Sequence, residues 1–99
     1  MLFDGFFYLI ENPDVLTAVN SKQFQDAFSH FEAFGHRESR QPNQLFDPTY
    51  YTPNNPDVAD AVNAGLFGHA FEHYQFFGEA ENRYPSSAFE GFDADIYLQ

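Results

Sequence analysis

Apolar side chains recur at helical spacing in two matching stretches of this chain. In residues 24–34 they follow the order i, i+3, i+4, i+7 and i+10, and residues 67–77 repeat that order. Such spacing brings the side chains to one face of an α-helix. Each stretch therefore predicts a helix that packs an aromatic face against its neighbours. The two faces consist of Phe24, Ala27, Phe28, Phe31 and Phe34, and of Phe67, Ala70, Phe71, Tyr74 and Phe77.

Two shorter helices are predicted ahead of each long one. Asn55 is suited to cap a helix that begins at Pro56, and apolar residues follow at helical spacing on one face of it. Residues 12–19 carry the same signals. Asp47 and Pro48 open an earlier short helix in the same way. No alternation of apolar and polar residues persists long enough to indicate a strand.

The chain carries this three-helix pattern twice. A shift of 43 residues matches 19 of the 43 positions between residues 3–45 and residues 46–88. A third copy begins in residues 89–99. A fixed period of this length is typical of stacked units that each need a neighbour to bury an apolar face. We therefore expect an all-α fold, with residues 1–99 forming one helical-repeat domain of two repeats and part of a third.

The polar connectors after the long helices hold repeated glycines and arginines. Gly35 and Gly78 directly follow the last apolar position, which predicts left-handed C-terminal caps there. Arg40 and Arg83 lie further along, in a chain with only four basic residues. We expect each arginine to pair with an acidic residue of the neighbouring helix, with ligand recognition as the alternative.

Composition narrows the class of partner. Fourteen Phe and six Tyr provide an aromatic core, and the formal charge of −11 opposes binding to nucleic acid and to anionic membranes. The absence of cysteine excludes disulfides and thiol catalysis. No apolar stretch is long enough to span a membrane, and the first residues lack the features of a signal peptide. An export signal, if there is one, would lie elsewhere.

The repeated motif resembles one found in large secreted bacterial proteins, particularly hemolysin-type calcium-binding and surface-associated proteins. The matching segments are Phe46-Asp47-Pro48-Thr49-Tyr50-Tyr51, Asn55-Pro56-Asp57-Val58, His73-Tyr74 and Phe77-Gly78-Glu79-Ala80-Glu81-Asn82-Arg83. The resemblance implies an extracellular or cell-surface location. The chain has Ser39 and Asn82 where this type of repeat usually has glycine, and the glycine- and aspartate-rich nonapeptide of calcium-binding β-rolls does not occur in it.

Histidines are the first candidates for chemistry. His30 and His73 occupy equivalent positions at the edge of the aromatic face, where we expect each to bond the backbone or a carboxylate of the adjoining helix. A ligand or pH-sensing role is the alternative. His69 and His73 are i, i+4, a spacing that lets two imidazoles approach one zinc ion, although a solvated helix face also accounts for the pair.

Oxygen ligands for calcium are the second candidate. Helix capping already explains most of the repeated Asn and Asp residues, which leaves the acidic segment with Glu90, Asp93 and Asp95 as a candidate calcium site. It does not reproduce the ligand order of an EF-hand. Calcium, and less so zinc, is therefore an alternative ligand, whereas no other cofactor is expected.

Aromatic side chains on the outer surface indicate contacts with protein. Phe76 falls almost opposite the apolar face of its helix, where we expect contact with another repeat or chain, or partial burial under the connector. Phe92, Ile96 and Tyr97 of the incomplete third copy are further candidates for such contacts.

No arrangement of residues indicates an enzyme, because a nucleophile elbow, a phosphate loop and an isolated pair of carboxylates are all lacking. We expect a non-enzymatic repeat module of a secreted or surface-associated bacterial protein, acting in assembly, in adhesion or as a spacer. The partner would be protein, either a second copy or a larger assembly, and the sequence indicates no small-molecule substrate. The alternatives are a cation-dependent module and a small acidic subunit that docks on a larger protein.

Overall fold

The computed structural model describes residues 1–90, and every regular element among them is helical. This confirms the predicted all-α class. The first set of elements is α1 (Gly5–Glu11), α2 (Pro13–Asn20), α3 (Ala27–Ala33) and the 3₁₀ turn η1 (Gly35–Glu38). The second set is α4 (Pro48–Asn54), α5 (Pro56–Asn63), α6 (Ala70–His73), the π-helical turn η2 (Tyr74–Gly78) and the 3₁₀ turn η3 (Ser87–Phe89). Within this described part, no helix has the length and apolar character needed to cross a membrane.

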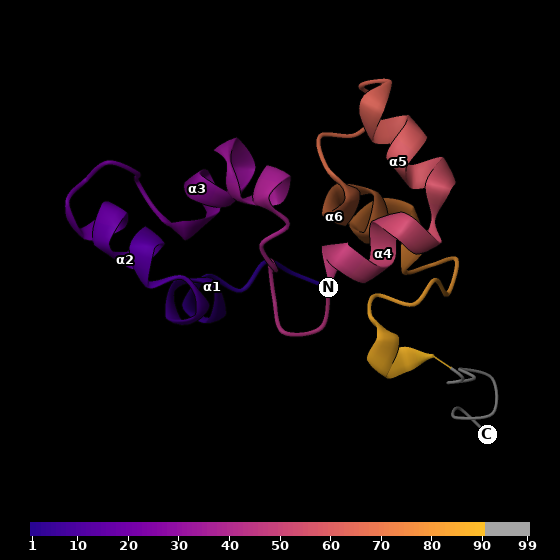
Figure 1. Cartoon of the computed structure of the whole chain (residues 1–99), viewed down its shortest axis with the longest axis horizontal. Helices are drawn as coiled ribbons and strands as arrows, with labels where there is room; N and C mark the ends of the chain where they lie inside the picture. The colour runs from indigo at the N-terminus through magenta and orange to yellow at the C-terminus, as the bar shows by residue number, and fades with distance from the viewer. Residues whose placement is uncertain (91–99) are drawn as a thin grey trace.

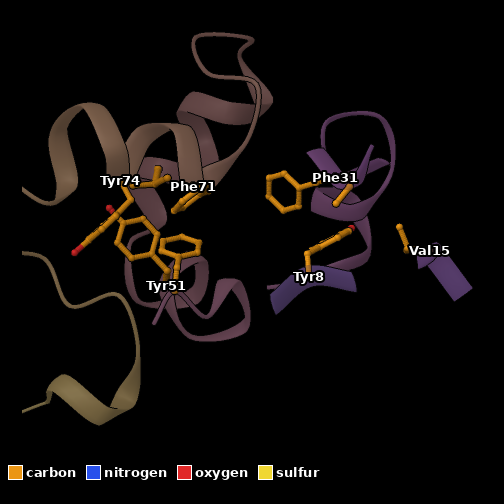
Figure 2. Packing of buried hydrophobic residues seen from close by; sticks show 9 residues of the cluster. Tyr8, Val15, Phe31, Tyr51, Phe71 and Tyr74 are labelled. Atoms are coloured by element: carbon orange, nitrogen blue, oxygen red, sulfur yellow. The ribbon is translucent and has the colours of Figure 1, made fainter. Parts of the chain in front are cut away.

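The two sets of helices form two lobes that lie side by side, joined by the connector between η1 and α4 (Figure 1). We call the lobes repeat 1 and repeat 2, with the bounds 3–45 and 46–88. Most of the predicted third copy lies outside the described residues. The buried apolar residues of the two lobes form one cluster, in which the Phe31 ring extends from α3 toward repeat 2 (Figure 2). Its members are Tyr8, Val15, Ala27, Phe31, Phe46, Tyr51, Val58, Phe71 and Tyr74.

A tyrosine and a histidine form the centre of each repeat. The hydroxyl of Tyr8 lies 2.8 Å from Nδ1 of His30, and Tyr51 and His73 make the same contact at 3.0 Å. Burial raises the pKa of Tyr8 to about 12 and lowers the pKa of His30. The phenol therefore stays protonated and donates a hydrogen bond to Nδ1 of a neutral imidazole. Both histidines bond a phenol rather than the predicted backbone or carboxylate group.

An arginine fastens the connector of each repeat to its second helix. In repeat 1 the Nη1 and Nη2 atoms of Arg40 donate to the two carboxylate oxygens of Asp14, at 2.9 and 2.8 Å. Nη1 also donates to Asn12, and Nε donates to Glu38. Repeat 2 has the same four bonds, made by Arg83 to Asp57, Asn55 and Glu81. The predicted ion pairs are therefore confirmed, and the side chains of the two asparagines bind arginine rather than capping their helices.

The long helices begin three residues later than predicted. Asp26 and His69 are in extended conformation, and their side chains accept the backbone N–H of Ser29 and Glu72, respectively. These caps fix the first helical residues at Ala27 and Ala70. Phe24 and Phe67 therefore precede the helices, although their rings still pack on the imidazoles of His30 and His73.

The left-handed caps predicted at Gly35 and Gly78 are wrong. In residues 1–90 the positive φ angles occur instead at Ser39 and Asn82, at 58° in each, and at Lys22 and Gly65. The two predicted glycines serve close packing, since a Cβ on either one would overlap the hydroxyl of the tyrosine at the centre of its repeat. Phe34 and Phe77 were also expected in the core, but they are 52% and 51% exposed. Phe34 lies past the end of α3 and Phe77 lies in the π-helical turn, so the α-helical spacing on which the expectation rested does not hold there.

Candidate functional site

His69 and His73 are not one turn apart on a helix, as the predicted zinc pair requires, because His69 precedes the first helical residue of α6. His69 precedes α6, and its Nδ1 accepts the backbone N–H of Glu72, so its Nε2 carries the hydrogen and points to Glu32 Oε1 at 2.9 Å. His73 instead bonds the hydroxyl of Tyr51. The two imidazoles thus serve different contacts, one between the repeats and one within repeat 2.

Other predicted metal ligands also have protein partners or lie outside the described residues. Glu90 accepts a hydrogen bond from the hydroxyl of Tyr50 at 3.0 Å. Asp93 and Asp95 lie outside the described part of the chain. In residues 1–90, no group of three or more histidine, aspartate and glutamate side chains is placed to hold a metal ion.

The His69 contact belongs to a junction between the repeats. The ring centroids of His36 and His69 are 5.1 Å apart, and the Phe31 ring packs edge-on against His69 at 5.0 Å. The centroids of the Phe31 and Phe71 rings are 6.2 Å apart, in an edge-on arrangement. The junction therefore combines aromatic packing with a charge-assisted hydrogen bond from His69 to a carboxylate of α3.

Beside this junction, the two repeats enclose a cleft of about 900 Å³, which we call the inter-repeat cleft. Repeat 1 contributes residues from α3, η1 and the connector, and repeat 2 contributes residues from α4, α5 and α6. Its apolar lining consists of Pro48, Pro53, Ala59, Val62 and Ala70, together with three phenylalanines whose rings are almost fully buried. The phenylalanines are Phe31, Phe46 and Phe71, and the lining also includes His36, Arg37 and His69.

The charge along this cleft is opposite to that of the whole chain. None of the described residues that line the cleft is acidic, although the chain holds 15 acidic residues. Arg37 and Arg40, two of its four basic residues, both line the cleft. Arg40 is bound to Asp14, whereas the guanidinium of Arg37 makes no hydrogen bond or ion pair to any described residue. The cleft thus presents one free positive charge beside an apolar wall.

A second surface lies on repeat 1, on the side away from repeat 2. In repeat 2 the side chains of Thr49, Pro53, Ala59 and Phe71 line the inter-repeat cleft and so face repeat 1. Their equivalents, 43 positions earlier, face the corresponding direction, where the described chain has no further repeat. We call these four residues the end face: Phe6, Ile10, Leu16 and Phe28. Their exposed fractions range from 41% to 78%.

Sequence reasoning missed both surfaces, although a signal for the end face was present. At three of its four positions a large apolar residue replaces threonine, proline or alanine of the second copy. Reading the differences between the copies, rather than their matches, would have identified it. The predicted contact residue Phe76 is 69% exposed, whereas Phe92, Ile96 and Tyr97 lie outside the described residues.

Comparisons with protein families, with curated proteins and with solved structures found no match to this chain.

Proposed function

We propose that this chain is a non-enzymatic helical-repeat module that assembles through its end face, which packs against the end face of a second copy. The resemblance of its motif to repeats of secreted and surface-associated bacterial proteins supports a role in such a protein, outside the cell. The observation that carries the proposal is the contrast between two equivalent phenylalanines. Phe71 is 2% exposed under repeat 1, whereas Phe28 is 48% exposed on the end face.

The composition of the end face favours a partner. Single exposed apolar side chains are common on protein surfaces, but a group of large ones on one side of a small domain is typical of a contact surface. Phe6 is 78% exposed and Ile10 is 58% exposed. Repeat 2 uses smaller or more polar residues in the corresponding places, where it borders a cleft. The end face is therefore suited to direct packing.

The structure favours a symmetric dimer over a head-to-tail chain of molecules. Repeat 1 contacts repeat 2 through Phe31, Glu32 and His36, whose equivalents are Tyr74, Gln75 and Glu79. Part of that second surface is already used, because Gln75 donates to the backbone oxygen of Met1 and Glu79 binds its amino group. A two-fold pairing of end faces needs only one kind of surface, and closed dimers are the commonest oligomers.

Sedimentation equilibrium tests this assembly. Wild type should form dimers at high concentration, and more so at about 0.5 M than at about 0.05 M salt, because screening weakens the repulsion between two chains of charge −11. The variant Phe6→Thr/Leu16→Ala introduces the residues of repeat 2 and should remain monomeric. Leu66→Gln is the matched control, since it replaces a 72% exposed leucine outside the end face by its repeat 1 counterpart.

Two outcomes would contradict the proposal. One is a wild-type chain that stays monomeric at millimolar concentration and high salt. The other is a double variant that dimerises as wild type does while its circular dichroism shows an intact helical fold. If only Leu66→Gln prevented association, the contact surface would lie elsewhere on the molecule.

A further inference from the structure

The inter-repeat cleft has the features of a ligand site that the assembly function does not use. Its volume of about 900 Å³ lies within the range of small-molecule sites in proteins. It lies between the repeats, whereas the end face lies on the outer side of repeat 1. A ligand in the cleft could therefore bind whether or not the end face is covered.

The accessible apolar lining and the free cation come from different repeats. Pro48, Val62 and Ala70 belong to repeat 2 and are partly exposed. Arg37 belongs to η1 of repeat 1. A ligand that contacts both must carry an apolar part and a negatively charged part.

The charge of the lining selects the sign of the ligand. Carboxylates are frequent elsewhere on the chain, and each of the other two arginines is bound to an aspartate. Arg37 has no such partner among the described residues. A guanidinium presents its N–H groups in a planar fork that matches the two oxygens of a carboxylate. The guanidinium of Arg37 is unpaired and the cleft lining contains no carboxylate, so the cleft favours an organic anion over a cation.

We propose that the inter-repeat cleft binds a small organic carboxylate, with the carboxylate held by the guanidinium of Arg37 and an aromatic or aliphatic body packed on the apolar lining of repeat 2. His36 also lines the cleft and would add a positive charge to it when protonated.

Binding should be coupled to the protonation of His36. Burial lowers the pKa of this imidazole, and the positive charge of Arg37 lowers it further, whereas the carboxylate of Glu32 opposes this effect. A bound carboxylate adds a negative charge on the side of Arg37 and should raise the pKa of His36. By linkage, binding then takes up a proton, so affinity should increase as the pH falls and level off only below the ordinary imidazole pKa of 6.5, where His36 of the free protein is itself protonated.

Titration with 4-phenylbutanoate, followed by isothermal calorimetry and NMR, tests the proposal. The backbone amides of His36, Arg37 and Phe71 should shift on binding. The neutral analogue 4-phenylbutanamide, and the variant Arg37→Gln with the carboxylate, should each bind at least about tenfold more weakly. Lys22→Gln is the matched control, since it removes the same charge from the loop after α2 and should leave affinity unchanged.

Several results would overturn this inference. Absence of shifts at the cleft with millimolar phenylbutanoate would do so, as would equal affinity for the amide or for Arg37→Gln. Inorganic phosphate or acetate binding as tightly as phenylbutanoate would show that the apolar wall contributes nothing. Because dimerisation is measured separately with the end-face variants, failure here leaves the proposed assembly untouched.

Discussion

At the scale of single residues, the centre of each repeat depends on one close approach. The tyrosine hydroxyl lies against a glycine and bonds a histidine. This arrangement leaves no room for a side chain at the glycine and no room for water at the hydrogen bond. Tyr8 is fully buried, and His30 is 7% exposed. In such a site a phenol and an imidazole satisfy each other, and either one left alone would remain a buried polar group without a partner.

The first prediction concerns this close approach. Gly35→Ala would place a methyl group onto the hydroxyl of Tyr8 and 3.3 Å from Cδ1 of Phe31. We expect the free energy of unfolding to fall by about 2 kcal/mol or more, from overpacking and from strain on the bond to His30. Urea denaturation measures this change.

A double-mutant cycle identifies the cause. In a Tyr8→Phe background the hydroxyl is absent, so Gly35→Ala should cost clearly less than it does in wild type. Gly5→Ala serves as a control, because its nearest neighbours lie at ordinary contact distances of 3.8 and 3.9 Å. Additive effects of Tyr8→Phe and Gly35→Ala would contradict the account.

At the scale of elements, the sequence predicted the helical class, the second helices and the arginine pairs. These features depend on local signals, namely proline at the first helical position, apolar spacing, and a rare cation repeated at a fixed interval. The start of the long helix was wrong, because apolar periodicity continues through Phe24 while the cap at Asp26 fixes the first turn. The exposure of Phe28 and Phe34 depends on which neighbours cover them, and periodicity within one helix carries no such information.

The second prediction concerns the arginine that links the connector to α2. Arg40→Gln removes the paired bonds to Asp14 and the bonds to Asn12 and Glu38. The Asp14 side chain is 63% exposed, so solvent screening limits the loss to about 1 kcal/mol. Arg37→Gln, in the adjacent 3₁₀ turn, removes a guanidinium without a protein partner and should change stability by less than about 0.5 kcal/mol.

Salt provides a second readout for the same pair of variants. The difference in unfolding free energy between wild type and Arg40→Gln should shrink as salt increases, because the ion pair is partly exposed. An equal loss of stability in Arg40→Gln and Arg37→Gln would show that the connector is held by packing rather than by the arginine.

At the scale of the whole molecule, two units with the same pattern of internal contacts differ in what covers them. Repeat 1 lies over the α6 face of repeat 2, with Phe31, His36 and Glu32 at the junction, and nothing in the described chain lies over the matching face of repeat 1. The copies differ in residue type where this difference matters most, at the end face. The asymmetry therefore lies both in the sequence and in the exposure of equivalent positions.

The last prediction uses the equivalent phenylalanines to measure that asymmetry. Phe71→Ala should cost about 3–5 kcal/mol, because the ring is buried between the repeats, whereas Phe28→Ala should cost about 1 kcal/mol in the monomer. Since only folded chains can dimerise, association adds stability by mass action, and Phe28→Ala removes part of that gain. The cost of Phe28→Ala should therefore rise with protein concentration in thermal melts, while that of Phe71→Ala should stay constant. A cost of Phe28→Ala that is independent of concentration would place the assembly contact away from the end face, even if the chain proved to be a dimer.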